Sequence, residues 1–151
     1  MKQSYEEKKH YSDFLPGKIT RDGFIGKDTR HIHDIVESDR LILDKLNISN
    51  EIIADRLQYF IDAGKEGLES HVDLGNFIVK IEWDRGMLPC PFGEKGLHHK
   101  LIAHVIQKAA GRMICYSQLN VHMIRKHGFF EGLGSAYRLD PEMLVHEKFL
   151  I

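Results

Sequence analysis

The residues of this chain best suited to chemistry are one cysteine and four histidines in its C-terminal half. Cys90 stands between two prolines in the stretch PCPFG, and His98 and His99 follow it as a pair. His122 and His127 lie further on, in the stretch LNVHMIRKHGFF. Thiolate sulfur and imidazole nitrogen are ligands that zinc commonly takes in proteins, and four of them close a tetrahedral site.

These residue types and spacings predict a transition-metal site, with zinc as the metal. The predicted ligands are Cys90, His99, His122 and His127, with His98 as the alternate to His99. The two prolines fix the backbone on either side of Cys90, so the turn directs its thiol one way. His122 and His127 lie about 140° apart on an ideal helix, but a glycine-broken helix end lets such a pair converge. His99 is favoured over His98 because it adjoins the start of a predicted strand.

The order of these features is a cysteine turn, a histidine pair, a β-hairpin and a helix with two histidines. It loosely resembles the knuckle, hairpin and helix of zinc-finger and treble-clef folds over about residues 88–128. The turn holds one cysteine, where a full knuckle holds two. The resemblance implies a structural zinc ion.

Three functions from different classes remain open at this point. The first is a binding or regulatory domain with a structural zinc, which a closed shell of four ligands would favour. The second is a metal-dependent or Cys/His hydrolase, which an open coordination position beside a carboxylate such as Glu94 would favour. The third is a metal-free interaction domain. Whether the protein is an enzyme stays open, and its partner is an unknown macromolecule or small molecule.

Two other resemblances rest on short stretches. HIHD at 31–34 is similar to the His-Asp pair of HD-type phosphohydrolases, which are all-helical, whereas the C-terminal half here has strand patterns. LNVHMIRKHGFF is similar to the helix, glycine and aromatic ending of GNAT acetyltransferases. Those enzymes bind pyrophosphate on a glycine loop between a strand and a helix, and FGEKGLHHK has the wrong glycine spacing for it.

Composition bounds the class of protein. A chain of 151 residues is ordinarily one domain, and 42% hydrophobic content suffices for a core. The net charge of −1 gives no nucleic-acid signature. No apolar run approaches the roughly 18 residues of a membrane span, and the N-terminus has no apolar signal region. Two cysteines make no disulfide framework, so a cytoplasmic location is expected.

The N-terminal half is predicted to be helical. Residues 1–27 form an arm with a short polar helix over 4–15. Residues 28–64 form a helical hairpin, since apolar residues recur there at three- and four-residue spacing. Asp28 is the expected cap of its first helix, Ser49 caps the second, and Gly64 ends it.

The C-terminal half switches to two-residue alternation near residue 75. Residues 76–83 are predicted as a strand, 84–99 as a loop, and 100–116 as a hairpin, although 97–110 could also be drawn as a helix. A helix capped by Ser117 and ended by Gly128 closes the segment 76–128, and residues 140–151 form a final helix begun by Asp140 and Pro141. Cys115 is assigned to the core. The sequence thus predicts an α+β fold: an N-terminal helical hairpin packed on a small antiparallel sheet, with C-terminal helices, in a single domain over 1–151.

Overall fold

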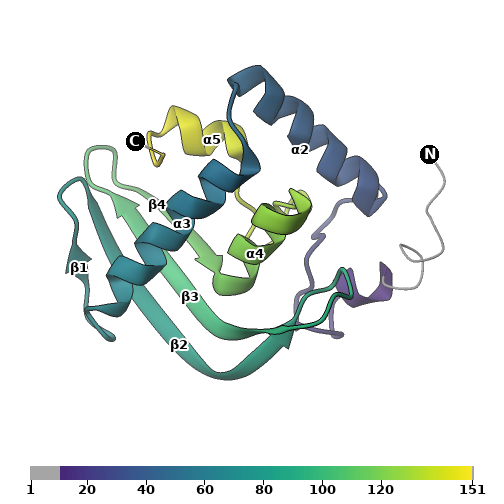
Figure 1. Cartoon of the computed structure of the whole chain (residues 1–151), viewed down its shortest axis with the longest axis horizontal. Helices are drawn as coiled ribbons and strands as arrows, with labels where there is room; N and C mark the ends of the chain where they lie inside the picture. Colours follow the sequence, from purple (N-terminus) through teal and green to yellow (C-terminus); the bar gives the residue numbers. More distant parts are fainter. Residues whose placement is uncertain (1–10, 151) are drawn as a thin grey trace.

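The predicted α+β fold is confirmed by the computed structural model, which describes residues 11–150 (Figure 1). Its helices are the 3₁₀ turn η1 (Ser12–Phe14), α2 (Ile32–Leu46), α3 (Asn50–Lys65), α4 (Gln118–His127) and α5 (Pro141–His146). Its strands are β1 (Val72–Asp73), β2 (Phe77–Pro89), β3 (Leu97–Gln107) and β4 (Arg112–Ser117). Of the helix predicted over 4–15, residues 4–10 lie outside the described residues and the rest gives only η1. Within the described range, no helix has the length and hydrophobicity to cross a membrane.

The four strands form one antiparallel sheet in the order β1-β2-β3-β4. The predicted hairpin over 100–116 is therefore correct, and the helical alternative for 97–110 is not. Strands β2 and β3 make a long two-stranded ribbon that pairs Phe77 with Gln107 at one end and Pro89 with Leu97 at the other. Figure 1 shows this ribbon extending past α4 towards η1.

The prediction of a loop over 84–99 is wrong for most of that range. Strand β2 continues to Pro89 and β3 begins at Leu97, so only seven residues, 90–96, connect them. The pairing shifts register between Trp83 and Met87. Gly86 lies in this bulge with φ of 95°, a backbone conformation that glycine tolerates. Such a bulge bends and twists a strand without ending it. The glycines of this segment favoured a loop in the sequence prediction, although the strand continues through Gly86.

The first predicted helix starts later than expected. Helix α2 begins at Ile32, and no side chain caps it. The Asp28 carboxylate instead accepts hydrogen bonds from Arg30 Nε at 2.8 Å and from the backbone N–H of Leu133 at 3.1 Å. Asp28 therefore ties two loops together, a long-range role that local capping rules do not predict.

Helix α3 crosses one face of the sheet. Ser49 caps it as predicted by accepting a helix N–H at 3.2 Å. The predicted end at Gly64 is wrong, because α3 runs to Lys65 and buries Gly64 inside it. A Cβ at Gly64 would lie 2.7 Å from side-chain carbons of both Val79 and Ile81. The glycine therefore serves close approach of the helix to β2.

Helix α5 starts as predicted, with Asp140 accepting the N–H of Glu142 and Pro141 in the first turn. It ends at His146, earlier than the predicted range of 140–151. Lys148 then takes a left-handed conformation with φ of 59°, and the chain turns to bury Phe149 completely.

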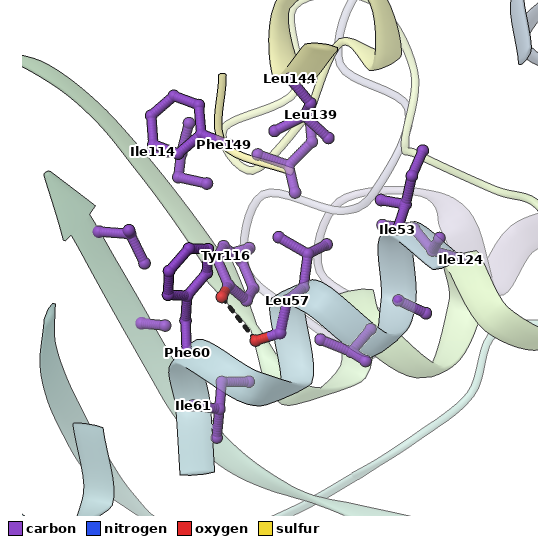
Figure 2. Close-up of a cluster of buried hydrophobic side chains, with 14 of the residues drawn as sticks. Ile53, Leu57, Phe60, Ile61, Ile114, Tyr116, Ile124, Leu139, Leu144 and Phe149 are labelled. Atoms are coloured by element: carbon purple, nitrogen blue, oxygen red, sulfur yellow. Dashed lines mark hydrogen bonds between the residues drawn. The ribbon is translucent and has the colours of Figure 1, made fainter. Parts of the chain in front are cut away.

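Within residues 11–150, buried apolar side chains form two clusters. The larger one, called the sheet core, lies between α3, the sheet and α5, where Tyr116 Oη donates to the Leu57 carbonyl at 2.7 Å (Figure 2). The smaller one, called the arm core, joins the N-terminal arm to α4 and to the turn over residues 90–96, called the ribbon tip. Its members are Phe14, Phe24, Ile25, Ile32, Ile35, Cys90, Leu119, Met123 and Phe129. The predicted metal ligand Cys90 thus belongs to the arm core.

Candidate metal centre

Four side chains converge where the ribbon tip meets the end of α4. They are Cys90, Glu94, His122 and His127, called the Cys90 group, and their ligand atoms all lie within 4.8 Å of one another. Tetrahedral bonds of 2.0–2.3 Å would place such atoms about 3.3–3.8 Å apart. Small shifts would therefore form a coordination shell, in which Glu94 Oε1 separates from the two imidazole nitrogens that it contacts. Among residues 11–150, no other set of three or more histidine, cysteine or acidic side chains gathers in this way. The group could therefore hold a metal ion.

The two imidazoles present the same ring atom to one point. His127 Nε2 lies 2.8 Å from Glu94 Oε1, and His122 Nε2 contacts the same carboxylate oxygen. Their ring planes are inclined at 77° with centroids 5.8 Å apart. Two nitrogens that approach from different directions could share one tetrahedral metal once the carboxylate oxygen between them shifts aside.

Cys90 is positioned by the turn that closes the ribbon. The N–H of Gly93 donates to the Cys90 carbonyl at 3.0 Å, and Gly93 has φ of 87°. The Cys90 side chain is 3% exposed because it packs in the arm core. The reversal also brings Glu94, four positions later, back towards the thiol. The rigid turn expected from Pro-Cys-Pro thus supplies two members of the group.

The histidines are positioned by the two ends of α4. Ser117 caps α4 as predicted, and its side chain and that of Asn120 together form a capping box. At the other end Gly128 is left-handed with φ of 62°, and its N–H donates to the Ile124 carbonyl at 3.0 Å. The N–H of Phe129 donates to the Met123 carbonyl at 3.2 Å, whereas a Schellman motif would place this bond on Ile124. The left-handed glycine is therefore as predicted, but the helix ends in the simpler αL motif and the predicted Schellman bonding is wrong. His127 is consequently the last residue of the helix, beside the buried turn.

An aromatic contact orients one of the imidazoles. The Phe92 ring stacks on His127 with centroids 3.9 Å apart and an interplanar angle of 11°. Phe92 in turn packs edge-on against Phe14 and Phe129 of the arm core, at centroid distances of 4.9 and 5.5 Å. The arm core therefore holds the imidazole plane as well as the thiol.

The electrostatics of the group favour a neutral thiol beside a charged carboxylate. Burial, reinforced by the neighbouring Glu94, raises the pKa of Cys90 to about 12. Burial would also raise the pKa of Glu94, but hydrogen bonds from His127, His122 and Cys90 outweigh it and lower that pKa to about 2. The charged Glu94 carboxylate could thus pair with a bound cation. Such a cation would also favour the thiolate form of Cys90.

The structure separates the two neighbouring histidines. The His98 ring lies 4.2 Å from the His122 ring between centroids, and burial together with His122 lowers the pKa of His98. His99, the predicted fourth ligand, is not a member of the Cys90 group. Side chains of consecutive strand residues point to opposite faces, and His99 lines a pocket beside Leu119. Glu94 occupies the place that the sequence prediction gave to His99.

A second contact between a thiol and an imidazole lies on the sheet. Cys115 Sγ is 2.9 Å from His104 Nδ1, and His104 Nε2 is 3.2 Å from Glu82 Oε1. These three residues are called the His104 row. Cys115 was expected in the core, but it is only half-buried because the alternation of β4 turns it away from the buried Ile114 and Tyr116.

Comparison with known proteins finds no matching family model, no matching curated protein and no matching solved structure. A function can therefore be inferred only from the side chains of the described residues, chiefly those of the Cys90 group.

Proposed function

We propose that this protein binds one zinc ion through Cys90, Glu94, His122 and His127. The observation that supports it is the approach of two imidazole Nε2 atoms to one carboxylate oxygen beside a buried thiol. A donor set of one sulfur, two imidazole nitrogens and one carboxylate oxygen suits zinc. Magnesium and calcium prefer shells made of oxygen, which argues against both.

The proposed role of the zinc is structural, in a binding or regulatory domain. Four protein donors fill a tetrahedral shell and leave no place for water. Such an ion would join the ribbon tip to α4 and so hold the arm core in place. The partner would be a macromolecule or a small molecule. Both cysteines are free thiols, in keeping with the cytoplasmic location that the sequence predicts.

One observation favours a second candidate, a metal-dependent hydrolase. The Glu94 side chain is 35% exposed, whereas the other members of the group are less so, and it is therefore the donor best able to leave the shell. With Glu94 displaced, three ligands would remain, and a carboxylate near an open position is the arrangement of a general base.

The test of metal binding is elemental analysis of untagged protein, followed by zinc titration against a competing chelator. One zinc per chain is expected. Cys90→Ser and His122→Ala should each weaken zinc binding by more than about 100-fold, since each removes a direct ligand rather than an outer contact. Cys115→Ser and His104→Ala are matched controls, because they remove the same chemistry from the His104 row. Protein that contains no zinc and binds none, or equal losses in both pairs, would refute the proposal.

Glu94→Ala separates the structural role from the hydrolase. As a ligand in a closed shell, Glu94 is needed for affinity, so this variant should bind zinc at least about tenfold more weakly. As a general base it is needed for turnover, and the variant would keep its affinity while losing hydrolysis of an activated ester. The second outcome would replace the structural proposal with the hydrolase.

A further inference from the structure

A cavity of about 380 Å³ lies beside the bulge of the ribbon, apart from the Cys90 group. Its walls come from residues 19–24, the bulged part of β2 and β3, the start of α4 and residues 131–137. Pockets for small ligands usually measure about 300–1,000 Å³. β-Bulges are also frequent next to binding sites, because they redirect side chains.

The cavity combines apolar walls with one buried acid. Its apolar side chains include Ile19, Phe24, Leu88, Leu101 and Leu119. Glu131 also lines it and is only 2% exposed. Its carboxyl oxygens accept hydrogen bonds from the Asn120 amide and the Ser135 hydroxyl, one on each oxygen. A carboxylate has about four lone-pair sites, so each oxygen retains capacity for a further donor.

The backbone at Glu131 is held in an unfavourable conformation. Its φ of 69° is left-handed, a conformation that residues with a side chain rarely adopt. The surroundings impose it: Arg138 Nη1 donates to the Glu131 carbonyl at 2.8 Å and to Asp39 at 2.7 Å. A Cβ on the next residue, Gly132, would lie 2.2 Å from the carbonyl oxygen of Ile25. Strain of this kind is concentrated at binding and catalytic sites.

Burial raises the pKa of Glu131 to about 7, although Ser135, Asn120 and Arg138 each oppose the shift. At neutral pH this acid therefore exchanges readily between its two forms. Buried acids with displaced pKa values in a cavity are typical of functional sites.

We infer that this cavity binds a small molecule with an apolar or aromatic body and a basic nitrogen, which pairs with Glu131. The apolar walls fit the body, and an ammonium supplies a further donor and a direct charge partner, whereas the Asn120 and Ser135 groups that now donate to Glu131 are neutral. At the rim, Asp22 and Asp84 are balanced by two basic residues, so the negative charge that selects a cation is that of Glu131 itself. The basic residues are Arg21 and Lys100, and Arg21 already pairs with Asp22 at 3.4 Å. This inference does not depend on zinc binding.

The test uses benzylamine as the probe, with benzyl alcohol and phenylacetate as its neutral and anionic analogues. Amide chemical shifts of the full chain are followed by NMR during each titration, with and without zinc. Benzylamine should shift amides of residues 131–137 and of the start of α4, with a dissociation constant in roughly the millimolar range expected for so small a ligand. Benzyl alcohol should bind about tenfold more weakly, and phenylacetate more weakly still.

Two variants locate the site. Glu131→Gln keeps the size of the side chain and should weaken benzylamine binding about tenfold, to the level of benzyl alcohol. Ala136→Trp leaves Glu131 in place but fills the cavity from its exposed rim, and it should abolish binding of all three probes. Glu51→Gln, at an exposed position in the first turn of α3 away from the cavity, is the matched control and should leave binding unchanged.

Four outcomes would overturn the inference. They are equal or stronger binding of phenylacetate, absence of shifts around the cavity with benzylamine, unchanged benzylamine affinity in a folded Glu131→Gln protein, and unchanged affinity in Ala136→Trp. If Glu131→Gln fails to fold, the Ala136→Trp result and the order of the three probes decide the question. A chain that binds no zinc but prefers benzylamine would retain this site while losing the proposed metal centre.

Discussion

The Cys90 group and the His104 row are built from the same three kinds of side chain. The Cys90 group lies at the ribbon tip, where both Nε2 atoms of its histidines approach the carboxylate oxygen of Glu94. In the His104 row the imidazole lies between its neighbours, with Cys115 on Nδ1 and Glu82 on Nε2. The first arrangement surrounds a point, whereas the second forms a line across the outer face of the sheet.

The elements that carry the residues explain this difference. His104 and Cys115 are direct partners on neighbouring strands, and paired strand residues stand side by side about 4.5–5.5 Å apart between Cβ atoms. Their side chains project from the same face in parallel and do not enclose an ion. The Cys90 group combines a turn with a helix end, so its side chains approach from different directions. Convergence, rather than residue type, distinguishes a candidate metal site.

The largest effect expected is a stabilisation by zinc that requires the Cys90 group and does not require the His104 row. At free zinc about 1,000 times its dissociation constant, the free energy of unfolding should rise by roughly 4 kcal/mol. The double variant His122→Ala/His127→Ala should gain nothing, while His104→Ala/Cys115→Ala should gain as much as the original chain. Urea unfolding with and without zinc measures the difference. A gain that survives the first double variant would show that zinc binds elsewhere.

A contrast between two glutamates sharpens the comparison further. Three donors hold Glu94 charged, whereas burial raises the pKa of Glu131 from 4.5 to about 7. Above the unfolded-state pKa, the unfolded chain gives up this proton more readily than the folded chain. Glu131 should therefore leave the free energy of unfolding unchanged below about pH 4.5 and lower it increasingly as the pH rises to 7. Above that pH it should lower the free energy of unfolding by roughly 3 kcal/mol.

Glu131→Gln should consequently lose this part of the pH dependence and gain stability relative to the original chain as the pH rises from about 5 to 8. The difference between the two unfolding curves isolates the contribution of Glu131 from that of Arg138, Asp39 and the other charged groups nearby. Glu94→Gln provides the comparison for an acid whose pKa is shifted the other way. Parallel pH profiles of Glu131→Gln and the original chain would contradict the expectation.

The two thiols should differ in their reaction with iodoacetamide. Burial raises the pKa of both, so both react slowly at neutral pH, but Cys115 is half-buried and Cys90 is 3% exposed. Zinc should slow alkylation of Cys90 by about tenfold or more and leave Cys115 unchanged, because a coordinated thiolate is shielded. Mass spectrometry of peptides from a time course gives both rates. Equal protection of the two thiols would place the ion near both.

The smallest effect expected concerns the ring that supports His127. Phe92→Leu keeps an apolar side chain in the arm core but removes the stacked ring. Zinc affinity should fall by about tenfold or less, in the range seen when an outer contact to a ligand is lost. Tyr59→Leu serves as a control, since that exposed ring lies on α3. A loss as large as that of His127→Ala would mean that Phe92 does more than orient the imidazole.

Local signals predicted the parts of the candidate site that depend on local structure. Ser117 and Gly128 act at the ends of α4 as their residue types indicate, which fixed where His127 would lie. The prolines beside Cys90 correctly indicated a tight turn. Alternation of apolar residues likewise identified the central parts of β2, β3 and β4 and the α+β class, but not the short strand β1.

The fourth position of the site depended on long-range geometry. Whether His98 or His99 faces α4 is set by the length and twist of the ribbon, which the bulge at Gly86 changes. Because residues 84–99 were predicted as a loop, there was no strand register from which to choose between His98 and His99. Glu94 lies four residues after Cys90 in a turn closed by Gly93, and that spacing was the available sign that it would return to the thiol.

The division into two cores has a consequence for how fast an ion could enter and leave. Cys90 and Phe129 belong to the arm core, which is smaller than the sheet core. Clusters with fewer buried contacts open more often than the molecule unfolds as a whole. Release of zinc would then follow the local opening of the arm core, and its half-life would respond to substitutions at Phe14 while ignoring those at Phe60. The ion's residence time, rather than its affinity, would report on the least stable part of the chain.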